Sequence, residues 1–182
     1  MLEPCPDCGA RFAPHTGPTH RYIGASAACW ALYSELLVGV MPTETFLASS
    51  AVDARDDVAV VAPPGLEMVL VDAYAAQHHG VPSPQAIQSV AVHLLVLHGI
   101  LCHGVDPANA QWVRGRALRR RGMYRWLTPP VPTQALTLRH LFPGAGHRVR
   151  TSGEYVASVH ASWASAHGGT LEDWYRTHVL GN

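Results

Sequence analysis

Three of the four cysteines lie within the first 29 residues, and with one histidine they form the pattern Cys5-x2-Cys8-x11-His20-x8-Cys29. Thiolates and imidazole are common ligands of Zn²⁺, and four of them complete a tetrahedral site. Because four protein ligands leave no open coordination position, such a zinc would be structural. The pattern therefore predicts that one metal ion gathers residues 1–30 into a zinc knuckle.

Other interpretations of these cysteines stay open. His15 is an alternative fourth ligand, and reduced cysteines without a metal are a simpler reading. A redox CxxC pair needs no third cysteine, and an iron–sulfur cluster usually needs a fourth. The remaining cysteine, Cys102, lies in the apolar segment 94–102, which predicts a buried core thiol.

The composition fits one folded domain. The chain has 182 residues, of which 48% are hydrophobic, enough to bury one substantial core. We expect a single domain over residues 1–182, with the zinc knuckle packed on a helical bundle of residues 31–182. No secretion signal or membrane span is expected. Clustered metal-ligating cysteines suit a reducing compartment, so the sequence predicts a cytoplasmic protein.

Capping residues predict about six helices with short connections. Ser–Pro or Asp–Pro pairs and capping boxes mark helix starts, and glycines mark their ends. The first expected helix follows Ser26, and the second covers residues 66–79. The other four are expected from Pro84 to about His103, from Pro107 to near Gly122, from Thr151 to Gly168 and from Thr170 to Gly181. The only strand signal is at residues 58–61, and residues 42–65 and 127–136 should be irregular. The expected fold is all-α, a helical bundle with an amino-terminal zinc knuckle.

Five motifs stand in the first hundred residues: CPDCG from Cys5, GPTHRYIGAS from Gly17, CW from Cys29, VDAYAAQH from Val71 and QSVAVHL from Gln88. Together they resemble an uncharacterised bacterial family classed as a domain of unknown function. The resemblance favours His20 over His15 as the fourth zinc ligand. It also directs attention to the polar residues of its helical motifs, which are Asp72, Gln77, His78, Gln88 and His93. No activity comes with the family.

Polar side chains on apolar helices suggest an interior pocket. Asp72 interrupts the apolar run 68–74, which is costly unless the carboxylate meets a cation or hydrogen-bond donors. His93 lies on a helix that is apolar all round, and His160 shares a stripe with Trp163. We therefore expect four candidate catalytic residues to converge, namely Asp72, His78, His93 and His160, with Gln77, Gln88 and Trp163 as candidate substrate-binding residues.

This pocket has three readings at the level of the sequence. Its residues could carry out acid–base chemistry on a small molecule, could bind a second metal ion, or could simply be satisfied core residues. Ser89, one helical turn before His93, could complete a Ser–His–Asp set, although two neighbours on one helix seldom give an attacking geometry. Neither the substrate, the reaction class nor the oligomeric state follows from the sequence.

The basic residues exclude some functions and suggest another. The chain has no lysine, because all 13 of its Lys and Arg residues are arginine. This excludes Schiff-base, pyridoxal-phosphate and P-loop chemistry, each of which needs a lysine amine. Residues 107–153 hold nine arginines and no acidic residue. The segment Arg114–Arg125 could bind an anionic partner, or its arginines could pair with acidic residues of the first half of the chain.

The sequence therefore favours a small zinc-binding helical protein that acts as an enzyme on a small molecule through an Asp/His pocket. The alternative is a non-catalytic, zinc-stabilised binding protein that uses Arg114–Arg125 for an anionic partner. Nucleic acid and membrane are not expected partners in either case.

Overall fold

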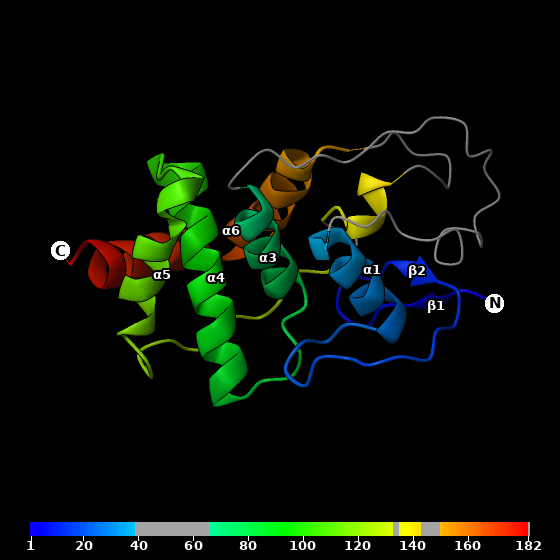
Figure 1. The fold of residues 1–182 in the computed structure, drawn as a ribbon. Coiled ribbons are helices and arrows are strands. Elements are labelled where there is room, and N and C mark those ends of the chain that lie inside the picture. Colours follow the sequence, from blue (N-terminus) through cyan, green and yellow to red (C-terminus); the bar gives the residue numbers. More distant parts are fainter. Residues whose placement is uncertain (39–65, 133–134, 143–149, 182) are drawn as a thin grey trace.

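The computed structural model describes residues 1–38, 66–132, 135–142 and 150–181, and Figure 1 shows how they are arranged. Within these ranges the chain is mostly helical, with five α-helices and one two-stranded sheet. In chain order the elements are β1 (Glu3–Pro4), β2 (Arg11–Phe12), α1 (Ala27–Val38), α3 (Leu66–Gln77), α4 (Pro84–His103), the 3₁₀ turn η1 (Pro107–Asn109), α5 (Ala110–Leu118), the 3₁₀ turn η3 (Leu138–Leu141), α6 (Ser152–Trp174) and the π-helical η4 (Tyr175–Leu180).

Helix α4 is the centre of the fold. The Ser83 side chain accepts a hydrogen bond from the Ala86 N–H, Pro84 occupies the first turn, and Gly104 ends the helix at a φ of +66°. These are the start and stop expected from the sequence, because a serine cap satisfies a free backbone N–H and glycine tolerates the left-handed conformation. Helices α3, α5 and α6 all pack against α4, and residues 94–97 are completely buried.

Among the described residues, α4 is also the one helix long and apolar enough to cross a membrane by length and composition. Of its most apolar window, 56% is buried inside the fold. An apolar helix that is largely buried by its neighbours is typical of the core helix of a bundle.

Helix α6 corrects one expectation. Thr151 and Glu154 form the expected capping box, in which each side chain accepts a hydrogen bond from the other residue's backbone N–H. The helix was expected to stop at Gly168, but it continues to Trp174 and then into η4. The separate helix expected to start at Thr170 is therefore part of α6 and η4. A helical glycine costs about 1 kcal/mol relative to alanine. Burial of Leu171 in the core beyond the glycines offsets that cost.

The amino-terminal segment packs at one end of the molecule. Strands β1 and β2 are antiparallel, with Glu3 opposite Phe12. This hairpin and α1 lie at one end, α5 and η4 lie at the other, and α3, α4 and α6 lie between them (Figure 1). Phe12 and Leu32 belong to the same buried cluster as residues of α3 and α6. The first 30 residues are therefore packed against the helical body.

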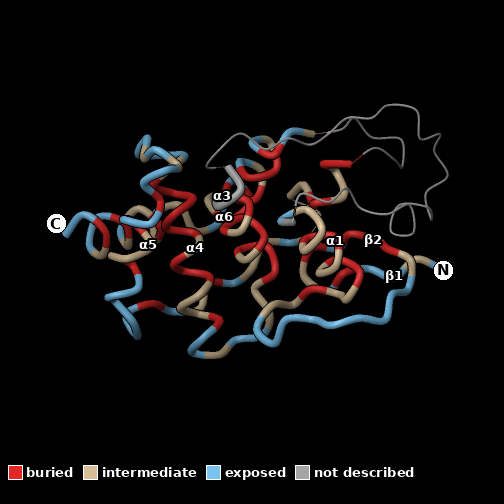
Figure 2. Tube along the Cα trace, in the orientation of Figure 1, coloured by how far each residue is buried: buried red, intermediate tan, exposed pale blue. Residues whose placement is uncertain are grey.

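Buried residues follow the inner sides of the helices (Figure 2). A second apolar cluster joins α4, α5 and η4, and includes Val113 and Val179. The expected strand at 58–61 and the irregular segment 42–65 lie outside the described residues. The described part of 127–136 contains no α-helix or β-strand, as expected.

Candidate metal centre and an Asp–His pair

Cys5 and Cys8 lie on the turn that follows β1. The Cys5 N–H donates to the Ala10 carbonyl at 2.7 Å, and the Gly9 N–H donates to the Cys5 carbonyl at 3.0 Å. Gly9 has a φ of +73°, in the left-handed region that glycine adopts most easily. This tight turn directs both sulfurs inward, and both cysteines are buried.

Cys29 comes from the first turn of α1. The Ser26 hydroxyl accepts a hydrogen bond from the Cys29 N–H at 3.2 Å, which is the cap expected from the sequence. The Ser26 N–H points at the Cys5 sulfur at 3.4 Å, as a backbone donor to a thiolate does. The Sγ atoms of Cys8 and Cys29 are 3.9 Å apart.

His78 follows the end of α3 and brings the fourth donor. Its Nε2 lies 3.3 Å from the Cys29 Sγ, and its Nδ1 lies 2.9 Å from the Tyr74 carbonyl. Since a carbonyl only accepts, Nδ1 carries the proton in this contact, and Nε2 is left to act as a ligand. The ring is 1% exposed.

The four side chains fit a zinc ion. The three sulfurs and the His78 nitrogen all lie within 4.8 Å of one another. With Zn–S of about 2.3 Å and Zn–N of about 2.0 Å, a tetrahedral site places its donors about 3.5–3.8 Å apart. The observed separations of 3.3 and 3.9 Å are close to this. Cys5, Cys8, Cys29 and His78 could therefore hold Zn²⁺ without rearrangement of the backbone.

Charge is concentrated at this cluster. Hydrogen bonds from Cys29 and Cys8 hold the pKa of the Cys5 thiol far below its usual value. Burial lowers the pKa of His78, but hydrogen bonds and charge from Cys5 and Cys8 outweigh burial and raise it to about 10. Buried thiolate character needs a compensating cation, and a divalent metal supplies it more fully than one imidazolium.

A second polar cluster joins α3, α4 and α5. The buried Asp72 of α3 accepts from His93 Nδ1 at 2.6 Å and from the Arg114 guanidinium at 2.6 and 2.7 Å. The carboxylate that interrupts an apolar helix thus has both a cation and a hydrogen-bond donor. Partners of this kind were expected for a carboxylate in an apolar run. Contact between Asp72 and His93 was expected. The Arg114–Asp72 pair agrees with the interpretation in which arginines of Arg114–Arg125 pair with acidic residues of the first half of the chain.

His93 and Arg114 line a surface pocket of about 440 Å³ between α4 and α5. Gln88 also lines it, and neither polar atom of the Gln88 side chain has a hydrogen-bond partner among the described residues, although both atoms are buried. The other lining residues are Pro84, Gln85, Ser89, Val92, Leu118 and Arg121. No acidic residue lines the described part of this pocket.

A family model matches residues 3–174, nearly the whole chain. The chain belongs to DUF5946, a family of unknown function. The resemblance seen in the first hundred residues is thereby confirmed and extends through α6. Comparisons with curated proteins and with solved structures give no match.

In this DUF5946 chain His20 does not occupy the place expected of it. It is exposed, its ring packs on Trp30 with centroids 5.3 Å apart, and its Nδ1 accepts from the Tyr22 N–H. His78 lies beside the sulfurs instead, because the end of α3 is packed against the knuckle. Spacing along the chain favoured the nearer histidine, whereas the fold brings a histidine 49 residues beyond Cys29 to the sulfurs.

The expected single pocket is divided among three places. His78 lies in the Cys cluster, Asp72 and His93 lie together between α3 and α4, and His160 of α6 lies beside His98 with ring nitrogens 3.2 Å apart. Helical phase correctly placed each of these side chains away from open solvent. It could not tell which buried faces meet.

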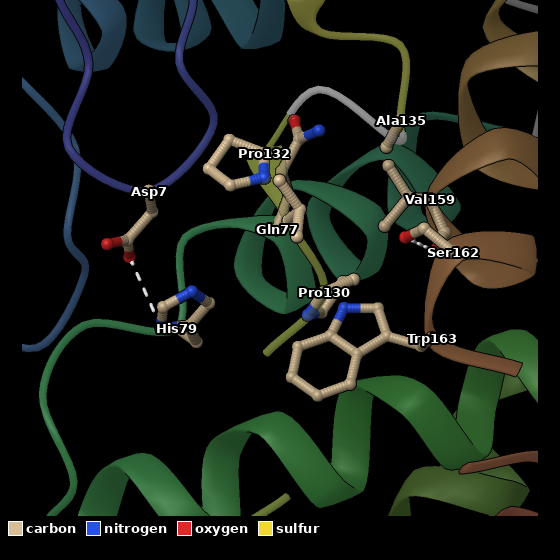
Figure 3. A pocket seen from close by; sticks show the side chains of 10 residues that line it. Asp7, Gln77, His79, Pro130, Pro132, Ala135, Val159, Ser162 and Trp163 are labelled. Carbon is tan, nitrogen blue, oxygen red and sulfur yellow. Dashed lines mark hydrogen bonds and ion pairs between the residues drawn. The ribbon is translucent and has the colours of Figure 1, made fainter. Parts of the chain in front are cut away.

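Gln77 and Trp163 have structural contacts. The Gln77 amide donates to the Leu136 carbonyl at 2.7 Å and accepts from the Tyr155 hydroxyl at 3.0 Å. Both Gln77 and Trp163 line a hollow of about 20 Å³ near Asp7 and His79, shown in Figure 3. This volume holds about one water molecule, so it is too small for a substrate.

Asp7 of the knuckle turn fixes this end of the molecule. Its carboxylate accepts from the Gly80 N–H at 2.7 Å and lies 3.6 Å from His79 Nδ1 (Figure 3). The turn that carries Cys5 and Cys8 is thereby tied to the loop directly after His78. Sequence reasoning singled out neither Asp7 nor His79.

Cys102 corrects another expectation. It was expected as a buried thiol, but it is exposed near the carboxyl end of α4. The last turn of α4 extends past the helices that cover its middle, so an apolar sequence there does not imply burial. Sequence reasoning also missed Glu172, whose carboxylate contacts both His98 and His103.

Proposed function

We propose that this protein is a zinc-stabilised helical enzyme that acts on a small anionic molecule in the pocket between α4 and α5. His93 is its general base, and Asp72 positions His93. One observation carries the proposal: a buried carboxylate holds the Nδ1 of a histidine at 2.6 Å, and that histidine forms a wall of the pocket.

The chemistry of His93 follows from this contact. The Asp72 carboxylate only accepts, so the proton of a neutral His93 ring is on Nδ1 and the lone pair is on Nε2. The His93 side chain is 19% exposed, which leaves it accessible from the pocket. An imidazole held in this way can take a proton from a bound molecule and return it, the usual role of an Asp–His pair.

The pocket suits an anion. Arg114 and Arg121 supply positive charge, and no carboxylate lines the described part of the pocket to oppose an anion. Arg114 is partly neutralised by Asp72, so Arg121 has the greater effect on a ligand. A volume of about 440 Å³ lies in the usual range for small-molecule sites. A small carboxylate or phosphate ester fits these features.

A metal ion at Asp72 is less well supported. Both Asp72 oxygens already contact Arg114, and the two other histidines that the sequence suggested as ligands lie elsewhere. No His/Cys/Asp/Glu group of metal-site geometry in the described residues includes Asp72. We therefore propose that this pocket carries out proton transfer without a metal ion.

The binding-protein alternative has less support. Arg114 pairs with Asp72, and Arg116 donates to the Val179 carbonyl at 3.0 Å. Two arginines of the Arg114–Arg125 segment thus serve the fold itself. The exposed arginines that remain are Arg119, Arg120, Arg121 and Arg125, and Arg125 donates to the Thr170 hydroxyl at 3.4 Å. We keep a reducing compartment such as the cytoplasm as part of the proposal, because none of the four cysteines is paired in a disulfide.

The experiment compares ligand binding and turnover in matched variants. Inorganic phosphate and a set of small carboxylates and phosphate esters are added to the purified protein, and the melting temperature and substrate loss by NMR are followed. Arg121→Ala should remove the stabilisation by ligand, whereas Arg119→Ala, which changes an exposed arginine outside the pocket lining, should not. His93→Gln should keep binding and lose turnover. Equal effects of the two arginine variants, or full turnover in His93→Gln, would refute the proposal.

A further inference from the structure

Two buried histidines from different helices face one another near the carboxyl end of α4. His98 of α4 and His160 of α6 are 5% and 6% exposed, and His98 Nδ1 lies 3.2 Å from His160 Nε2. Neither belongs to the Cys cluster or to the pocket beside His93. Two adjacent buried imidazoles need either a shared proton or a common ligand.

Glu172 decides which nitrogen of His98 carries the proton. Its Oε2 lies 3.0 Å from His98 Nε2. Since the carboxylate only accepts, His98 is protonated on Nε2, and its Nδ1 presents a lone pair toward His160. A carboxylate behind a histidine in this way orients metal-binding histidines and raises their basicity.

His160 is suited to the same role. Its Nε2 faces the lone pair of His98 Nδ1, so two neutral rings can direct one nitrogen each at a shared ion. A neutral imidazole is the form that binds metals. The nitrogen separation of 3.2 Å is close to the roughly 3.3 Å between two histidine ligands of one tetrahedral zinc.

Cys102 supplies a third donor. It follows His98 by one helical turn, so both side chains lie on the same face of α4. The Cys102 sulfur and one ring nitrogen from each of the two histidines all lie within 4.8 Å of one another. Partial burial and the charge of Glu172 raise the pKa of this thiol, and a metal ion would displace its proton on binding.

We propose that His98, Cys102 and His160 form a second metal site, for Zn²⁺ or a similar borderline-soft divalent ion, with Glu172 as the carboxylate that orients His98. Three protein ligands leave one coordination position for water or another small ligand. Because Cys102 is exposed, this position is reached from solvent. The site is thus unlike the enclosed Cys3His cluster, whose four ligands are all buried.

One rival donor set uses the same histidine. His98, His103 and Glu172 also lie close enough to share an ion. That set would take Glu172 as a direct ligand and would not use Cys102 or His160. Substitutions at Cys102 and His103 therefore separate the two sets.

The test measures bound metal in protein prepared without a histidine tag. Apoprotein is reconstituted with Zn²⁺ for elemental analysis and with Co²⁺ for visible absorption, in which thiolate ligation gives a charge-transfer band. The wild type should bind two ions per chain. Cys102→Ser and His160→Gln should each bind one, and Cys102→Ser should lose part of the Co²⁺–thiolate absorption. His103→Gln should still bind two.

Each other outcome overturns the proposal. One ion in the wild type that Cys102→Ser leaves in place would assign all metal to the Cys3His cluster. Two ions in Cys102→Ser together with one in His103→Gln would assign the second ion to the rival set. Because Cys102 is exposed, its serine variant should fold normally even if His160→Gln does not, and circular dichroism checks this.

Discussion

At the scale of single residues, the buried carboxylate of Asp72 requires a counter-charge and hydrogen-bond donors. Its side chain is 0% exposed and contacts one arginine and one histidine. Removing one member of a buried ion pair usually costs about 3–5 kcal/mol, because the other charge is left without compensation. The pair therefore stabilises the packing of α3 against α4 and α5 only while both members are present.

We predict that Asp72→Asn lowers the free energy of unfolding by about 3 kcal/mol, because it leaves Arg114 without its counter-charge. The double variant Asp72→Asn/Arg114→Met should lose less, since neither charge remains. Urea unfolding of the wild type, both single variants and the double variant measures this. A loss below about 1 kcal/mol in Asp72→Asn would mean that the pair behaves like an exposed one.

His78 and His20 offer a direct comparison of two candidate ligands. His78→Gln should weaken zinc binding by at least about 100-fold, because it removes a donor from the coordination sphere. His20→Gln should leave the affinity unchanged, because His20 is exposed and contacts Trp30 and Tyr22 rather than the sulfurs. Competition with a chromophoric chelator measures both affinities. If His20→Gln lost more zinc affinity than His78→Gln, His20 rather than His78 would be the fourth ligand, as the spacing along the chain predicted.

The sequence predicted three of the four clustered donors as one group, and it assigned the fourth, His78, to the Asp/His pocket instead. Cys5, Cys8 and Cys29 are close in the chain, and local signals such as Gly9 and the Ser26 cap determine where their side chains lie. His78 depends on how α3 packs against the knuckle, and no local pattern encodes that packing. The Asp72–His93 contact was predictable because a buried carboxylate must find a partner.

At the scale of elements, the helix starts at Ser83 and Thr151 were predictable, but the start expected at Thr170 was wrong. Two helix ends also differ, because α6 continues past Gly168 and α5 ends at Leu118 rather than near Gly122. The caps at Ser83 and Thr151 are local hydrogen bonds that the sequence determines. The continuation of α6 past Gly168 depends on tertiary packing, which overrides the weak preference of glycine against helix. A glycine in α4 and a glycine in α6 therefore have different surroundings, since Gly99 packs closely on Tyr175 and Gly168 has open space around it.

We predict opposite effects for two Gly→Ala substitutions. A Cβ at Gly99 of α4 would lie 2.9 Å from the buried Tyr175 ring, so Gly99→Ala should destabilise the fold by about 1–3 kcal/mol. A Cβ at Gly168 of α6 would meet nothing within 4 Å, so Gly168→Ala should stabilise it by about 0.5–1 kcal/mol. Thermal unfolding of the two variants measures both. Destabilisation by Gly168→Ala would contradict this prediction and would indicate that the chain is not a continuous helix at Gly168.

At the scale of the whole molecule, the candidate metal centre joins parts that are distant in sequence. The four side chains that could hold the ion come from the turn after β1, from α1 and from the end of α3. The helical body has a further core of its own between α4, α5 and η4, remote from these ligands. Loss of zinc should therefore loosen the amino-terminal end before it affects the rest of the molecule.

Trypsin can test this, because the chain has no lysine and is cleaved only after arginine. Removal of zinc by a chelator should speed cleavage after the exposed Arg11 and Arg21 by about tenfold, equivalent to local opening that is easier by about 1.4 kcal/mol. Cleavage at the exposed Arg119–Arg121, beyond α5, serves as the internal control and should keep its rate. Mass spectrometry of timed digests measures both rates. If all sites accelerate together, the metal stabilises the whole fold as one cooperative unit, and if none does, the cluster is not what holds the amino-terminal end in place.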